Sequence, residues 1–158
     1  MIKKIILFFI LATTLVAFTT NKDTKYKCMI QMTNYEGEGA YIVISLLNPE
    51  GAYEKTLYVH GDDDEWHHDI TEWWSFHGKV RTDIDAITGA TISGGNRSIC
   101  IIDIPDNKIN NGYKIRFETA VEDKEYYTDD VEFELTSESV NSKVDGKGFI
   151  RYIRMIPQ

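Results

Sequence analysis

Most of the chain consists of short apolar segments in which hydrophobic and polar positions alternate, with Gly, Asn and Asp between the segments. Residues 27–32 alternate in this way, and residues 40–47 form a run rich in β-branched side chains that is typical of a buried strand. Residues 48–51 read Asn-Pro-Glu-Gly, which is a turn signal, and a further strand pattern follows over residues 53–59. The spacing predicts a β-hairpin over residues 40–59.

Four further runs have the composition of strands, at residues 97–104, 113–121, 131–136 and 149–156. The last of them we expect to be an added edge strand. Together with the three segments above they make seven short strands separated by turn signals. This pattern predicts an all-β fold, an immunoglobulin-like antiparallel β-sandwich with one short Trp-rich helix and a long motif-bearing loop.

One segment has the period of a helix instead. Over residues 64–77 five side chains repeat on one helical face, Trp66, Ile70, Trp73, Trp74 and His77. The acidic residues 62–65 precede it, as suits a helix amino terminus. The pattern predicts a helix that covers an open end of the sandwich and buries its indoles. The alternative is that one indole stacks on a planar ligand.

The first residues form a leader. Residues 1–4 are short and basic, and residues 5–18 are almost unbroken apolar sequence. This arrangement predicts a secretory signal peptide over residues 1–20 and a mature β-sandwich domain over residues 21–158. The apolar run is shorter than the roughly 20 residues that a membrane span needs, so we expect no stable membrane insertion after cleavage.

The net charge and the cysteine content limit the classes of binding partner. The chain has 17 Lys and Arg against 25 Asp and Glu; without Lys3 and Lys4 the basic count is 15 and the net charge about −10. An acidic exported domain is a poor candidate for binding nucleic acid or anionic lipid. Export makes a disulfide between Cys28 and Cys100 chemically possible, while two buried free thiols are equally ordinary.

The stretch over residues 79–96 carries the candidate chemistry, because long loops without structure of their own tend to be functional. Its middle, residues 85–91, reads Asp-Ala-Ile-Thr-Gly-Ala-Thr. Gly89 and Ala90 leave little bulk beside the Thr91 hydroxyl, and Asp85 supplies a carboxylate six residues earlier. Such a segment suits an exposed modification or ligand site.

Residues 85–91 resemble the Asp-x-x-(Ser/Thr)-Gly-Ala-(Thr/Ser) signature at which a secreted flavin transferase attaches FMN through a phosphoester to the last hydroxyl. The wider stretch over residues 38–136 resembles a family of predicted periplasmic proteins known as DUF2271. The resemblance rests on the strand at residues 41–44, the segment at residues 55–59, the Trp73-Trp74 pair, the motif and the strand start at residues 112–115.

The resemblance implies a periplasmic electron carrier with covalent FMN on Thr91 and with Asp85, Thr88, Gly89 and Ala90 as the rest of the attachment motif. Its implied partners are the flavin transferase and membrane or periplasmic redox proteins. With a flavin attached, Trp73, Trp74 or Phe76 would be placed to stack on its ring, and burial in the core is the other explanation of the same residues. Asp85 and Thr88 have a second reading, as groups that cap the loop by hydrogen bonds.

A different function class stays open beside this one, a non-redox sandwich that binds a partner protein or a glycan through its loops and aromatic helix. Catalysis is uncertain, because the sequence has no nucleophile elbow and no glycine-rich phosphate loop. His60, His67, His68 and His77 cluster near acidic residues, but their spacing is not that of a metal site, and we expect no metal.

Overall fold

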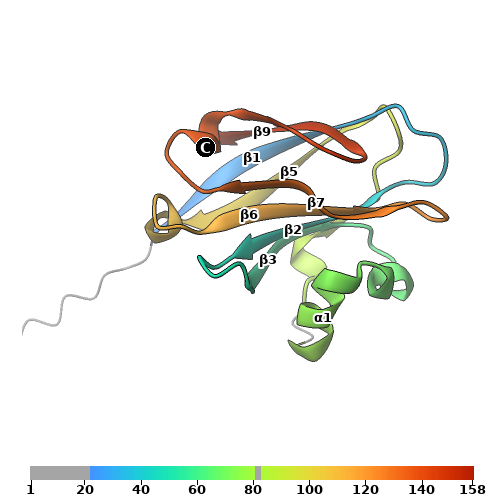
Figure 1. The fold of residues 1–158 in the computed structure, drawn as a ribbon, viewed down its shortest axis with the longest axis horizontal. Helices are drawn as coiled ribbons and strands as arrows, with labels where there is room; N and C mark the ends of the chain where they lie inside the picture. Colours follow the sequence, from blue (N-terminus) through green and yellow to red (C-terminus); the bar gives the residue numbers. More distant parts are fainter. Residues whose placement is uncertain (1–21, 81–82) are drawn as a thin grey trace, which may run out of the picture.

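The computed structural model describes residues 22–80 and 83–158, and the predicted signal peptide lies outside these residues. In the described part, no helix has the length and apolarity that would let it cross a membrane. Two β-sheets face each other, with one short α-helix outside them (Figure 1). The predicted all-β sandwich is confirmed.

The first sheet has the strand order β5-β1-β9-β8 and the second β4-β3-β2-β6-β7. Across the described residues this makes nine strands, two more than the pattern predicts, because β4 and β8 are too short to leave a sequence signal. The strands are β1 (Asp23–Met32), β2 (Tyr41–Leu47), β3 (Tyr53–His60), β4 (Thr88–Gly89), β5 (Arg97–Pro105), β6 (Lys114–Ala120), β7 (Tyr126–Glu134), β8 (Lys143–Asp145) and β9 (Ile150–Pro157).

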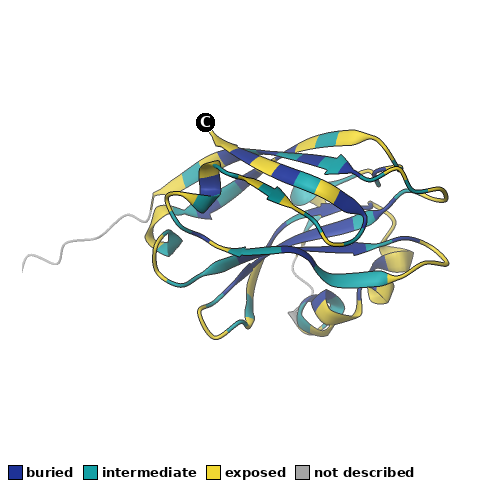
Figure 2. Cartoon of the chain, turned by 45° about the horizontal axis from the view of Figure 1, so that its top comes forward, coloured by how far each residue is buried: buried dark blue, intermediate teal, exposed yellow. Residues whose placement is uncertain are grey.

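The predicted hairpin is confirmed as β2 and β3, which pair antiparallel. Ile42, Ile44 and Leu46 of β2 point into the core between the sheets, while the alternate residue Val43 points to the outer face. Both sets are buried, which explains why the sequence of β2 is apolar at almost every position. Figure 2 shows buried residues concentrated where the two sheets face each other.

The prediction that residues 149–156 form an edge strand is wrong. β9 lies inside its sheet, between β1 and β8. Its inward residues Ile150, Ile153 and Met155 are buried in the core. A strand with this much apolar surface is placed most favourably between two neighbours, where both its edges and its inner face are covered.

The prediction of one helix over residues 64–77 is also wrong. A 3-10 helix, η1 (Asp64–Asp69), ends at Ile70, and the α-helix α1 (Thr71–Val80) begins after it. Trp66 on η1 is 40% exposed, whereas Trp73 on α1 is fully buried, so the indoles do not share one buried face. The break lies at Ile70, whose backbone leaves helical geometry at φ −85° and ψ 72°.

The position of α1 corrects the expected cap on an open end. Ile70 and Trp73 pack with Val43 and Val59 on the outer face of the five-stranded sheet. The Trp73 indole N–H donates to Thr56 Oγ1 at 2.8 Å. The helix therefore covers a sheet face (Figure 1), which satisfies the indole nitrogen and buries its ring at the same time.

A buried carboxylate ties α1 to this face. Glu118 on β6 is fully buried and accepts hydrogen bonds from the Tyr53 hydroxyl at 2.6 Å, from the Tyr126 hydroxyl and from the Trp73 backbone N–H at 3.3 Å. Desolvation raises the pKa of Glu118, and the two tyrosine hydrogen bonds oppose that rise in part.

This raised pKa predicts a pH dependence of stability that the Glu118→Gln variant removes. Glu118 holds its proton more tightly in the folded protein than in the unfolded chain. Its contribution to the free energy of unfolding is therefore fully present below the ordinary glutamate pKa of 4.5 and is lost as pH rises through the folded pKa. Urea unfolding from about pH 4 to pH 8 should show wild type losing free energy of unfolding relative to Glu118→Gln.

The exposed Glu122 supplies the control, because Glu122→Gln should leave that pH profile unchanged. A wild-type advantage over Glu118→Gln that grows with pH would contradict the assignment of Glu118.

Candidate functional site

The motif segment is not the unstructured loop that its length predicts. Residues 85–87 form a short 3-10 turn, and β4 pairs in parallel with the edge of β3, with Thr88 opposite Val59 and Gly89 opposite His60. The Gly61 N–H donates to the Gly89 carbonyl at 2.6 Å. The exposed edge of β3 supplies the backbone hydrogen-bond partners of β4. This edge exists only in the tertiary fold, so the motif sequence alone does not predict the pairing.

A second pairing holds the segment on the other side of Thr91. Ala40 and Ile92 form an antiparallel bridge, with N–H to O distances of 2.8 and 3.1 Å. The Tyr35 hydroxyl donates to the Ile92 carbonyl at 2.6 Å and accepts from the Ala40 N–H at 2.9 Å. Thr91 therefore lies between two fixed points on the edge of the sandwich.

The Thr91 side chain is half-buried and lies against Gly39. A Cβ on Gly39 would be only 2.3 Å from Thr91 Oγ1, so the glycine is required for this approach. Within residues 22–80 and 83–158, no hydrogen bond engages the Thr91 hydroxyl. The Thr91 hydroxyl is therefore unbonded among the described residues, and backbone hydrogen bonds on both sides fix the segment that carries it.

Gly89 and Ala90 have separate roles beside Thr91. A Cβ on Gly89 would lie 2.6 Å from the Tyr58 hydroxyl, so any larger residue would displace the Tyr58 side chain. The exposed Ala90 turns its carbonyl inward, 3.1 Å from His60 Nδ1. These contacts direct the Ala90 backbone toward the core and leave the methyl group in solvent.

Asp85 and Thr88 lie away from the Thr91 hydroxyl. The Thr88 hydroxyl donates to the Ile84 carbonyl at 2.8 Å, which agrees with its reading as a capping group. Asp85 is exposed, and its backbone N–H donates to Asp83 Oδ1 at 3.0 Å, so the capping carboxylate is that of Asp83. Asp85 and Thr88 line a hollow of about 420 Å³ with Trp74, which does not include Thr91.

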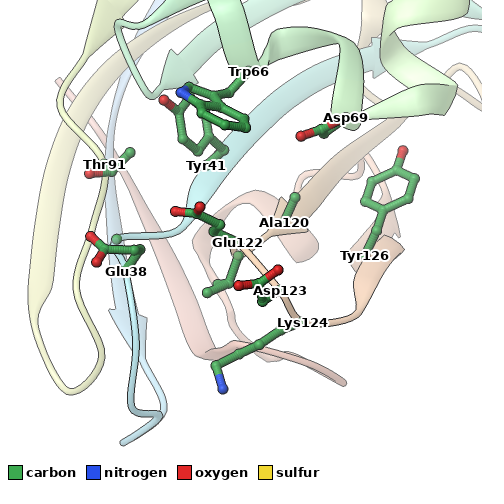
Figure 3. Close-up of a pocket in the computed structure, with 12 residues that line it drawn as sticks. Glu38, Tyr41, Trp66, Asp69, Thr91, Ala120, Glu122, Asp123, Lys124 and Tyr126 are labelled. Atoms are coloured by element: carbon green, nitrogen blue, oxygen red, sulfur yellow. The ribbon is translucent and has the colours of Figure 1, made fainter.

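Thr91 lines two other hollows. The larger, of about 450 Å³, we call the aromatic hollow (Figure 3); its walls are Glu38, Gly39, Tyr41, Trp66, Asp69, Thr91, Ala120, Val121, Glu122, Asp123, Lys124 and Tyr126. The smaller, of about 250 Å³, lies between Tyr58, His60 and Arg97. Thr91 therefore lines both cavities.

The aromatic hollow contains residues that the sequence pattern did not indicate as functional. Figure 3 shows Thr91 and Glu38 on one side, Asp69 and Tyr126 on the other, and the Tyr41 and Trp66 rings beside η1. Tyr41 follows the strand pattern and Trp66 follows the helical stripe, so each is assigned to packing by sequence alone. Their proximity to Thr91 arises from the Ala40–Ile92 bridge and from the break after η1.

The expected stacking residues lie elsewhere. Trp73 is fully buried under α1 and exposes no ring face to a ligand. Trp74 is half-buried and belongs to the hollow of Asp85 and Thr88. Of the three tryptophans, Trp66 is the one that lines a cavity together with Thr91.

The aromatic hollow is acidic. Its lining includes four carboxylate side chains and a single lysine, Lys124, whose side chain lies against Gly37; the carboxylates are those of Glu38, Asp69, Glu122 and Asp123. Desolvation, followed by the nearby carboxylates of Asp63, Asp62 and Glu122, raises the pKa of Tyr41. The hollow therefore disfavours anions and accommodates a neutral or cationic planar group.

His67 and His77 both pack against the Trp73 ring, whereas His68 lies apart from them. His67 Nε2 lies 2.8 Å from the Gly61 carbonyl, His77 stacks on Trp73 with ring centroids 4.6 Å apart, and the exposed His68 lies beside Asp69. In the part of the chain that the structure describes, no three His, Cys, Asp or Glu side chains are placed to hold a metal ion.

The family model of DUF2271, described as a predicted periplasmic protein, matches residues 23–152. This span is wider than the resemblance over residues 38–136 and runs from β1 into β9, so it contains the sandwich and the motif segment. No curated protein and no solved structure matches the chain. Because the match covers most of its length, the chain belongs to the DUF2271 family of predicted periplasmic proteins.

Proposed function

We propose that this protein is a periplasmic electron carrier that bears FMN on Thr91 through a phosphoester formed by a secreted flavin transferase. The observation that supports this most strongly is the state of Thr91: its hydroxyl is unbonded among the described residues, and the residue lies between two backbone pairings and lines both hollows. An acceptor hydroxyl needs this combination of access and fixed position.

The attachment reaction needs only an acceptor hydroxyl from the carrier. The Thr91 oxygen forms a bond to the FMN phosphorus of FAD, the pyrophosphate bond breaks, AMP leaves, and the hydroxyl proton passes to a base of the transferase. Mg²⁺ and charge stabilisation come from that enzyme. Gly39, Gly89 and Ala90 add almost no side-chain bulk around the hydroxyl, which leaves the approach to Thr91 open.

The aromatic hollow fits the flavin ring better than the smaller hollow does. Its volume of about 450 Å³ lies in the range of ligand sites, and Tyr41 and Trp66 provide aromatic faces. The surrounding carboxylates of Glu38, Glu122 and Asp123 make uptake of electrons by the ring less favourable. We therefore assign the ring to the aromatic hollow, in place of the Trp73 and Trp74 position, and expect a lowered reduction potential.

Co-expression with a flavin transferase tests the proposal. The purified protein should show flavin fluorescence that survives denaturing electrophoresis, because a phosphoester persists when the fold is lost. Absence of both fluorescence and an FMN adduct in the intact mass, under conditions that load a known acceptor protein, would reject the carrier function and favour the non-redox binding module.

A further inference from the structure

The two cysteines of the chain face each other inside the sandwich. Cys28 on β1 is directly opposite Cys100 on β5 in antiparallel register. Both are free thiols, 0% and 4% exposed, and they are hydrogen-bonded to each other. Opposed residues on antiparallel strands have Cα atoms about 4.5–5.5 Å apart, which falls inside the range that disulfides span. The backbone is therefore already placed for a cross-strand disulfide.

His60 completes this cluster. It is 2% exposed, and its Nδ1 lies 3.1 Å from the Ala90 carbonyl oxygen. Because a carbonyl only accepts, Nδ1 carries the hydrogen, which leaves Nε2 of the neutral ring as an acceptor. Nε2 is buried and has no hydrogen-bond partner among the described residues. The imidazole lies close to the Cys100 thiol and acts on its titration.

The two thiols differ in acidity. The hydrogen bond from Cys28 and, more weakly, the interaction with His60 lower the pKa of Cys100 to about 6, although burial opposes this. The same thiol pairing, together with burial, raises the pKa of Cys28. Cys100 is thus the sulfur that ionises first, and thiolate is the form that attacks a disulfide.

We infer that Cys28 and Cys100 are a redox couple that closes to a cross-strand disulfide in the oxidising periplasm, with Cys100 as the attacking sulfur and His60 as its base. The oxidant is a disulfide of the thiol-oxidase class. The Cys100 thiolate attacks one oxidant sulfur, and the other sulfur leaves as a thiolate. Cys28 then loses its proton and attacks Cys100, which releases the second oxidant sulfur. Two electrons and the two thiol protons pass to the oxidant.

Because the folded Cys100 thiol is 4% exposed, the oxidant reaches it when the edge strand β5 opens locally, with His60 and Cys28 still beside the thiol. The disulfide then fixes β5, an edge strand that begins six residues after Thr91, to the neighbouring strand β1. The covalent bond thereby restrains the strand that follows the motif segment. This inference does not depend on the proposed flavin.

Thiol counting tests the inference. The full chain, exported with its own leader, is quenched in acid, unfolded in denaturant, alkylated and weighed as an intact protein. Wild type should carry no alkyl group before reduction and two after it, while Cys28→Ser and Cys100→Ser should each carry one without reduction. Two alkyl groups on unreduced wild type would overturn the inference, and this result does not require any variant to fold.

The role of His60 has its own test, the ultraviolet absorbance of the Cys100 thiolate against pH in the reduced protein. Wild type should titrate near pH 6. His60→Asn keeps a side-chain N–H for the Ala90 carbonyl but removes Nε2, so its thiolate midpoint should rise. The exposed His68 gives the control variant His68→Asn, which should titrate like wild type. An unchanged midpoint in His60→Asn would refute the role of His60 as the base.

Discussion

Thr91→Val should abolish FMN attachment completely. Valine matches the shape of threonine but lacks the oxygen that forms the phosphoester, so no acceptor remains at this position. The fold should be unaffected, because the Thr91 hydroxyl makes no hydrogen bond among the described residues, and the free energy of unfolding should change by less than about 0.5 kcal/mol. The measurement is flavin fluorescence after denaturing electrophoresis, together with urea unfolding of the same preparations.

Two further variants test the acceptor residue and the position of the flavin ring separately. Ser93→Ala removes an exposed hydroxyl two residues after Thr91, outside the attachment motif, and FMN attachment should persist. Trp66→Phe keeps an aromatic ring in the aromatic hollow and should also retain FMN, and the flavin fluorescence of the folded protein in solution should be brighter because the quenching indole is gone. Full loading of Thr91→Val would contradict the acceptor assignment, whereas unchanged brightness in Trp66→Phe would contradict only the ring position.

Of the substitutions proposed, Asp130→Ala should lower the free energy of unfolding most. Asp130 is fully buried on β7 and accepts hydrogen bonds from the Thr119 hydroxyl at 2.7 Å and from the backbone N–H groups of Lys147, Gly148 and Ile150 at 3.0, 2.8 and 2.9 Å. Alanine leaves the Thr119 hydroxyl and the Gly148 and Ile150 N–H groups without this acceptor, whereas the Lys147 N–H keeps the backbone carbonyl of residue 130 at 2.9 Å. Because each unsatisfied buried group costs about 1–3 kcal/mol, we expect a loss of about 3–5 kcal/mol in urea unfolding.

The neighbouring carboxylate provides the control for this prediction. Asp129 is half-exposed and pairs with the exposed Lys147 ammonium group, so Asp129→Ala should cost less than about 1 kcal/mol. Equal effects from the two variants would show that Asp130 does not organise the connection between β7 and the β8-β9 hairpin.

The local parts of the fold were predictable from sequence. The β2-β3 hairpin was predicted because strand alternation and the turn at residues 48–51 are both local signals. The position of β9 within its sheet was not, since a strand pattern does not say which neighbours the strand has. The helix break at Ile70 was missed because the apolar period continues through η1 into α1.

The candidate site was also predictable only where its residues are close together in the sequence. Thr91 was singled out by a contiguous motif, and the hydrogen bond from Thr88 to the Ile84 carbonyl agrees with capping, the second of the two readings of Thr88. The aromatic hollow joins Thr91 to Tyr41 and Trp66, which lie 50 and 25 positions earlier in the chain. Such a grouping depends on the Ala40–Ile92 bridge and on the placement of η1, and neither is visible in a short sequence window.

Peptide mass spectrometry of the protein co-expressed with a flavin transferase identifies the residue that carries FMN. Trypsin releases residues 82–97, which contain Thr82, Thr88, Thr91 and Ser93 as possible acceptors. We expect this peptide to gain the mass of FMN less one water, with fragmentation placing the addition on Thr91. An unmodified peptide from protein purified beside an active transferase, or an addition placed on Thr82, Thr88 or Ser93, would contradict this expectation.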